Sequence, residues 1–180
     1  MKKVFLSFAL VAVAATMMAS DNNVFTTGET AAPVADEVPI DEQKELTCDV
    51  YSVKVPEGWT ARSRVVSRTC VMGLNDEPFT YASFSAVSYN DVSYYQKSKQ
   101  EDGFSIREEK MKVGDHEFVI MDMEDEDGHF NIFAVTSWGE DGSISVKMAT
   151  GNCTLSQDEK KTAIEANLQT ILKNLTIKTK

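Results

Sequence analysis

The stretch SIREEKMKVGDHEFVIMDMEDEDGHFNIFAVTSWGEDGSISVKMA, residues 105–149, holds four apolar runs separated by short polar turns. Gly114-Asp115 and Asp141-Gly142 suit two-residue hairpin turns, because these residue pairs adopt positive φ readily. Strands joined by such turns are antiparallel neighbours. The stretch therefore predicts an antiparallel sheet. Its expected strands are Ser105–Val113, His116–Met123, Phe130–Trp138 and Ile144–Ala149.

The segment after this stretch predicts an amphipathic helix. Ser156-Gln157-Asp158-Glu159 is a capping box, in which the serine hydroxyl and the glutamate carboxylate each satisfy a free amide of the first turn. Apolar residues then recur at helical spacing, namely Ile164, Leu168, Ile171, Leu172 and Leu175. They form one stripe on an otherwise polar helix, which we expect to pack on the sheet.

Three strands and a short helix are expected upstream. Val50–Val55 alternates polar and apolar residues with a period of two, which is typical of a half-buried strand. Arg64–Met72 and Phe79–Ser88 predict two more strands. Asn90-Asp91 can then cap a helix over Val92–Gln100.

The first predicted strand ends in a characteristic corner. Tyr51-Ser52-Val53-Lys54-Val55-Pro56-Glu57-Gly58-Trp59 runs from a strand into Pro-x-Gly-Trp. With the closing helix, residues 46–178 resemble the PsbP/Mog-like family. The resemblance implies an α+β fold in which an antiparallel sheet is flanked by helices, an α/β/α sandwich. It also implies macromolecular interaction without catalysis. Trp59 itself is expected to be an apolar plug with one N–H to satisfy.

Residues 1–20 have the layout of a secretory signal peptide. Lys2 and Lys3 precede the apolar run Val4–Ala15, which is too short to span a membrane, and Met17-Met18-Ala19-Ser20 then offers small residues for cleavage. The first cysteine is Cys48, so no lipid anchor is expected. We therefore expect a soluble protein in the periplasm or outside the cell, without a membrane anchor.

Residues 21–45 are acidic, contain Pro33 and Pro39, and have no periodic apolar face. Such a segment cannot bury enough apolar area to offset the entropy of ordering its backbone. We expect a disordered acidic linker here, with a partner-binding tail as the alternative. A single globular α+β domain is expected over residues 46–180.

The charge limits the classes of partner. The chain has 18 basic and 28 acidic residues and a formal charge of −10, which becomes −12 when Lys2 and Lys3 leave with the signal. Such a surface repels phosphate backbones and anionic lipid headgroups. We expect no nucleic-acid partner, and a protein or another envelope component instead. The sequence has neither a phosphate-binding glycine loop nor a nucleophile elbow, so no cofactor and no catalytic residue are predicted.

Acidic side chains crowd the turn between the second and third strands of the quoted stretch. Asp122, Glu124, Asp125 and Asp127 are candidates for a weak calcium site, because calcium takes several oxygen ligands from a loop. Their spacing does not match the EF-hand pattern, and a solvated polar turn is the alternative. His129 lies just beyond, but the other histidine sits at a different turn, so no zinc site is expected.

Tyr89, Tyr94 and Tyr95 surround the predicted first helix. Exposed tyrosines suit protein interfaces because they combine apolar area with a polar tip. We take the three as candidate partner-binding residues. Ordinary packing is the alternative, with Val92 and one tyrosine facing the sheet.

The chain has three cysteines. If the first two strands pair across the Pro56 corner, Cys48 lies opposite Cys70, and an oxidising compartment would favour a disulfide between them. A slip of one residue would place the two side chains on opposite faces of the sheet. Cys153 would stay reduced.

These observations predict an exported binding or interaction module with no recognisable catalytic site. Two alternatives are left open. One is a small exported hydrolase whose site the sequence does not reveal, and the other is a calcium-stabilised domain.

Overall fold

The structure is a computed structural model that describes residues 38–178. The predicted signal peptide and residues 21–37 of the predicted linker lie outside the described residues. The rest of that linker is structured, since Ile40–Glu42 forms a 3-10 helix, η1, and Glu45–Thr47 forms strand β1. The predicted linker boundary at residue 45 is therefore wrong. Leu46 is 1% exposed and anchors β1 in the core, so the ordered chain begins ahead of it.

The described residues form a mixed α+β fold that consists mostly of antiparallel sheets, with two α-helices. The helices are α1 (Val92–Glu101) and α2 (Gln157–Lys173). The strands that follow β1 are β2 (Tyr51–Lys54), β3 (Trp59–Ala61), β4 (Thr69–Leu74), β5 (Thr80–Val87), β6 (Ser105–Ile106), β7 (Met111–Val113), β8 (His116–Glu124), β9 (Phe130–Trp138), β10 (Gly142–Thr150) and β11 (Leu175–Ile177).

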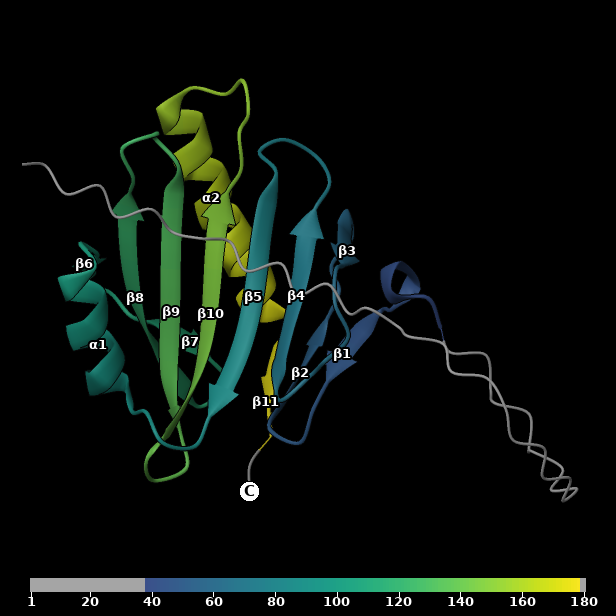
Figure 1. Ribbon diagram of the computed structural model, residues 1–180, viewed down its shortest axis with the longest axis vertical. Coiled ribbons are helices and arrows are strands. Elements are labelled where there is room, and N and C mark those ends of the chain that lie inside the picture. The colour runs from purple at the N-terminus through teal and green to yellow at the C-terminus, as the bar shows by residue number, and fades with distance from the viewer. Residues whose placement is uncertain (1–37, 179–180) are drawn as a thin grey trace, which may run out of the picture. The chain divides into compact units, whose positions relative to one another are not determined.

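The strands form two sheets (Figure 1). The larger has the order β3-β4-β5-β10-β9-β8-β6, with β7 also pairing with β8, and the smaller has the order β1-β2-β11. Every strand pairing in both sheets is antiparallel. The predicted meander is present as β7 to β10.

Two predicted strands differ from the structure in their bounds. The strand expected over Ser105–Val113 is divided into β6 and β7 by the charged run 107–110. Arg107 in this run donates its N–H to the Ile120 C=O, and its side chain reaches two carboxylates. The strand expected from Arg64 begins only at Thr69. A tight turn precedes it, in which Ser67 and Arg68 have φ of +49° and +61°.

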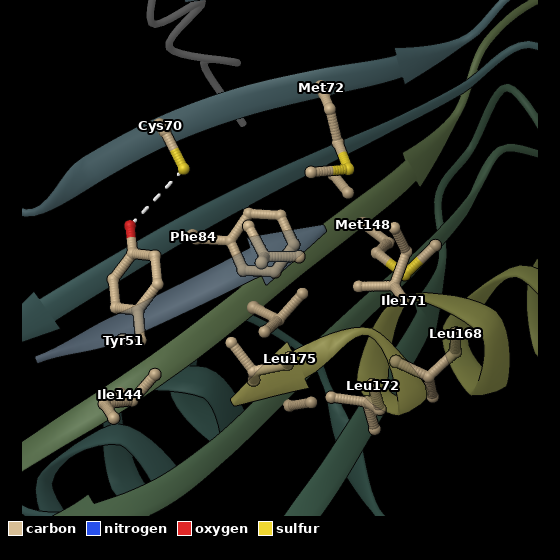
Figure 2. Packing of buried hydrophobic residues seen from close by; sticks show 14 of the residues in the cluster. Tyr51, Cys70, Met72, Phe84, Ile144, Met148, Leu168, Ile171, Leu172 and Leu175 are labelled. Carbon is tan, nitrogen blue, oxygen red and sulfur yellow. Dashed lines mark hydrogen bonds between the residues drawn. The ribbon is translucent and has the colours of Figure 1, made fainter. Parts of the chain in front are cut away.

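Helix α2 covers one face of the large sheet, behind it in Figure 1. Ser156 and Glu159 form the predicted capping box, and Ile164, Leu168, Ile171 and Leu172 are buried as the stripe predicts. Figure 2 shows Leu168, Ile171 and Leu172 in the same cluster as Met72 and Met148. The helix ends at Lys173, so the prediction that Leu175 lies on it is wrong. Asn174 is the C-cap, and Leu175 starts β11 beside β2.

Helix α1 covers part of the opposite face. Residues of β9 alternate, so that Ile132 contributes to the cluster under α2 and Phe133 to a second cluster under α1. Tyr95 packs on Phe133 with ring centroids 5.2 Å apart. Asp91 caps α1 as predicted, accepting a hydrogen bond from the Tyr94 N–H at 2.8 Å. The two helices thus lie on opposite faces of the large sheet.

The Pro-x-Gly-Trp corner carries the chain from the small sheet to the large one. β2 ends at Lys54, Gly58 takes a φ of +80°, and Trp59 opens β3 with its side chain 8% exposed in the core. The expected plug is therefore present. The corner also separates β2 from β4, which belong to different sheets.

This separation removes the basis for the predicted Cys48–Cys70 disulfide. Cys48 lies between β1 and β2, whereas Cys70 lies in β4, and both are free thiols in this structure, as is Cys153. The Tyr51 hydroxyl lies 3.4 Å from the Cys70 sulfur, as Figure 2 shows. Burial raises the pKa of Cys70 to about 11, so this cysteine is a protonated core residue.

Candidate binding groove

A groove with a volume of about 760 Å³ lies between the β7–β8 hairpin and the C-terminal part of the chain. One wall is formed by β7 and its turn, and the other by the last turn of α2 together with β11. Volumes of this size are typical of ligand sites in proteins. Its volume exceeds those of four other cavities among the described residues, which range from about 150 to about 410 Å³.

Local sequence signals build both walls. Gly114, with a φ of +57°, allows the tight turn that brings Val113 opposite His116. On the other side, α2 stops at Asn174 and the chain turns directly into β11, which pairs with β2. The groove therefore lies where two segments distant in sequence end up facing each other.

The groove combines an apolar floor with a partly basic rim. Apolar side chains of both walls line it, namely Met111, Val113, Leu172, Leu175 and Ile177. Lys112 and Lys173 are exposed at its rim beside the carboxylate of Asp115. Lys112 Nζ also lies 3.6 Å from Oε1 of Glu117, a carboxylate that pairs with Lys110 as well. This balance contrasts with the formal charge of −10 for the whole chain. The groove suits a ligand that has apolar groups and a negative charge.

Only two of the four acidic residues predicted to bind calcium lie together in the turn between β8 and β9. Ligand atoms of Asp125, Asp127 and His129 lie within 4.8 Å of one another. Asp125 Oδ1 accepts hydrogen bonds from the N–H groups of Asp127, at 3.1 Å, and His129, at 2.9 Å. The bond from the His129 N–H is the largest cause that lowers the pKa of Asp125. Asp125 therefore closes the hairpin turn through its side-chain carboxylate, which accepts from the backbone of the turn.

The His129 ring lies between two oxygen atoms. Its Nδ1 is 3.3 Å from Asp125 Oδ2, and its Nε2 is 2.7 Å from Asn152 Oδ1. The bond to Asn152 is the largest cause that raises the pKa of His129. Both ring nitrogens are thus engaged by the protein itself. His116 lies at the other end of β8, so the two histidines do not meet, as predicted.

The other two residues of the predicted calcium set do not join this cluster. Asp122 accepts a hydrogen bond from Arg107 Nε, and Arg107 Nη1 donates to Glu165 Oε2 at 3.0 Å. Glu124 lies near this ion-pair network, at a small cleft beside α2. The calcium site stays a prediction, with Asp125 and Asp127 as the carboxylates that remain together. Arg107 was missed by sequence reasoning, which focused on the acidic residues around it.

The three candidate tyrosines do not form one patch. Tyr95 packs on Phe133 under α1, whereas Tyr89 and Tyr94 are 75% and 54% exposed. The ring of Tyr94 contacts that of Tyr95 edge-on at 5.5 Å. One tyrosine facing the sheet is what the spacing predicts. None of the three lines the groove, so their role in partner binding stays a separate prediction.

Neither described helix is long and apolar enough to cross a membrane. No protein-family model matches the chain, and no curated protein matches it. A crystal structure of a protein from Bacteroides thetaiotaomicron VPI-5482 is similar, with a TM-score of 0.39 and 14% sequence identity. The match covers 72% of this chain and 46% of that one, so the chain spans less than half the length of that protein.

Proposed function

We propose that this protein is an exported binding module whose groove holds an apolar segment of a protein partner. The groove with its apolar floor, between β7 and β11, is the observation that carries the proposal. Apolar surface that is left open on a folded domain is typical of interaction sites. The module acts by binding, without a catalytic step.

The proposed setting is the periplasm or the extracellular space. It rests on the signal-like residues 1–20 and on the acidic composition, which disfavours nucleic acid and anionic membranes as partners. We also propose a PsbP/Mog-like fold. Its support is the antiparallel sheet with helices on opposite faces and the Trp59 corner.

The test is selection of short random peptides on the full chain, followed by affinity measurements on three variants. Val113→Asp places a charge in the apolar floor. Thr176→Asp places a charge on the opposite wall. Because Thr176 is exposed, this variant should fold and keeps the test valid if Val113→Asp misfolds. Val66→Asp is the matched control, because Val66 is 67% exposed and lies outside the groove.

We expect the selected peptides to be apolar and to bind the parent and Val66→Asp equally. Either groove variant should weaken binding by about tenfold or more, as loss of a central contact does. Equal affinity for all folded variants would show that the groove is not the binding site.

A further inference from the structure

We infer that the partner enters the groove as an extended strand that pairs with the free edges of β7 and β11. This inference rests on the proposed function and names the class of partner. That class is a peptide segment in which apolar and acidic residues alternate. Such strand addition uses main-chain hydrogen bonds for affinity and alternate side chains for specificity.

Both walls of the groove are strand edges. Among the described strands, β7 pairs with β8 alone and β11 pairs with β2 alone. Successive residues of β11 line the groove, and so do successive residues of β7 and its turn. Side chains of a strand alternate between its two faces, so a groove that lay over one face would be lined by every second residue. Because successive residues line this groove, it runs along the edges of the two strands.

The register of β11 fixes which main-chain groups point into the groove. The Asn174 C=O accepts from Lys54 and the Lys178 N–H donates to Val50, so both residues bond toward β2. In an antiparallel ladder the bonding direction alternates along the chain. Thr176 therefore also bonds toward β2, and the N–H and C=O groups of Leu175 and Ile177 point to the free edge.

The same reasoning applies to β7. Val113 and His116 flank a two-residue turn, which makes them a hydrogen-bonded pair. The bond from the Arg107 N–H to the Ile120 C=O confirms that even-numbered residues of β8 bond toward the edge that pairs with β6 and β7. Met111 is consequently bonded to Phe118, and the main-chain groups of Lys112 point away from β8.

Side chains and charge specify the sequence of the added strand. One face of that strand meets the apolar floor, which includes Leu172 and Leu175. Its other face is directed outward, where Lys173 and Lys112, an exposed lysine that shares a surface ion pair with Glu117, flank the groove. The occupant that fits has apolar residues on one face and carboxylates on the other. A peptide with lysines in place of the carboxylates would be repelled by the lysines of the rim.

The probe is a labelled, capped heptapeptide, Glu-Val-Glu-Val-Glu-Val-Glu, measured against the full chain by fluorescence anisotropy. A Lys-Val-Lys-Val-Lys-Val-Lys peptide is the charge control. Two further versions carry N-methyl groups, one on the valines and one on the glutamates. Each of these blocks the hydrogen-bond donors that face one edge while it retains every side chain.

We expect the parent peptide to bind and the lysine peptide to bind more weakly. Each N-methylated version should bind about tenfold more weakly, which corresponds to about 1.4 kcal/mol, through the hydrogen bonds lost at one of the two edges. In the protein, Lys112→Pro removes a donor at the free edge and should weaken binding more than Lys112→Gln, which removes the charge alone.

The outcomes separate this inference from the proposed function. Equal binding of all Glu-Val peptides, with binding lost in Thr176→Asp, would overturn strand addition and retain an apolar groove. Binding of selected apolar peptides without any binding of the Glu-Val peptide would also overturn the inference. If the groove instead mediated dimerisation that Thr176→Asp abolishes, the occupant would be a second copy, which likewise contradicts it. Unchanged binding in Thr176→Asp would contradict both proposals.

Discussion

The imidazole of His129 shows how a single residue links pH to stability. Its nitrogens lie near Asp125 Oδ2 and Asn152 Oδ1, so the protonated ring can donate to both, and its pKa is raised above the ordinary 6.5. A group whose pKa is higher in the folded state stabilises the fold fully when the pH is below its unfolded-state pKa. This stabilisation is lost as the pH rises through the folded-state pKa.

We therefore expect the melting temperature to fall more in the parent than in His129→Gln when the pH rises from about 5.5 to about 8, across the range in which histidine titrates. Thermal unfolding followed by circular dichroism measures this difference. His116→Gln is the matched control, because no bond to His116 closes the β8–β9 turn. Parallel pH profiles for the parent and His129→Gln would contradict the role of His129.

The same cluster makes a prediction about calcium. Calcium takes six to eight oxygen ligands, whereas Asp125 uses one carboxylate oxygen to close its own turn and Asp122 is bound to Arg107. We expect a chelator to leave the melting temperature of the full chain unchanged. A decrease that Asp127→Asn removes would instead support the calcium-stabilised alternative.

Arg107 joins the sheet to α2 through Asp122 and Glu165. Removing it leaves two partly buried carboxylates without their cation. Because the groups are partly exposed, we expect Arg107→Ala to cost about 1–2 kcal/mol, below the range for fully buried charged bonds. Urea unfolding tests this, with the exposed Lys97→Ala as a control that should change stability by less than about 0.5 kcal/mol. A cost equal to that of the control would show that the network is not stabilising.

At the scale of elements, α2 was the most predictable part of the chain because its signals are local. The Ser156–Glu159 box and the apolar stripe both lie within one continuous segment. Leu175 is the exception. It has the helical phase, but it also begins the strand that ends at Ile177, and periodicity alone does not distinguish the two for a residue at the end of a helix.

Turns were predicted less well than strands. The turn between β9 and β10 was expected at Asp141-Gly142, but Gly142 already pairs with Trp138, and Gly139 takes the positive φ of 69°. Either glycine can supply that conformation, so the residue type alone does not locate the turn. Between β6 and β7, Arg107 bonds to Asp122 of β8 and Glu165 of α2, contacts between distant segments that no local pattern indicates.

The packing of α2 gives a direct stability prediction. Leu168 is fully buried, so Leu168→Ala should cost about 2–5 kcal/mol. Ser156→Ala should cost about 1 kcal/mol through the lost cap. Denaturant midpoints measure both, with the exposed Lys161→Ala on the same helix as the control. A midpoint for Leu168→Ala equal to that of the parent would mean that this face is not the packed one.

At the scale of the whole molecule, the groove was beyond sequence reasoning. Its walls, β7 and β11, are separated in the chain by three long strands and α2, and each belongs to a different sheet. No local pattern in either segment indicates that they face each other. The resemblance at the Trp59 corner and the lack of a catalytic motif in the sequence led to the prediction of an interaction module, and the pairing of distant strands supplied its candidate site.

The contacts of the first described residues predict where protease will stop. Arg64 Nη2 donates to the Val38 C=O at 3.0 Å, and η1 follows directly. We expect limited proteolysis of the full chain to leave a stable product that begins near residue 38. Mass spectrometry identifies its first residue, and a product that begins beyond Leu46 would show that η1 and β1 are not part of the stable fold.

Amide hydrogen exchange, measured by NMR with and without the Glu-Val heptapeptide, tests the central claim most directly. Strand addition predicts that exchange slows at Lys112, Leu175 and Ile177, whose N–H groups point to the free edges. Thr176 is the internal control, since its N–H already bonds toward β2 and should change little. Slowing at all four residues alike, or shifts centred on Tyr89 and Tyr94, would contradict a strand bound between β7 and β11.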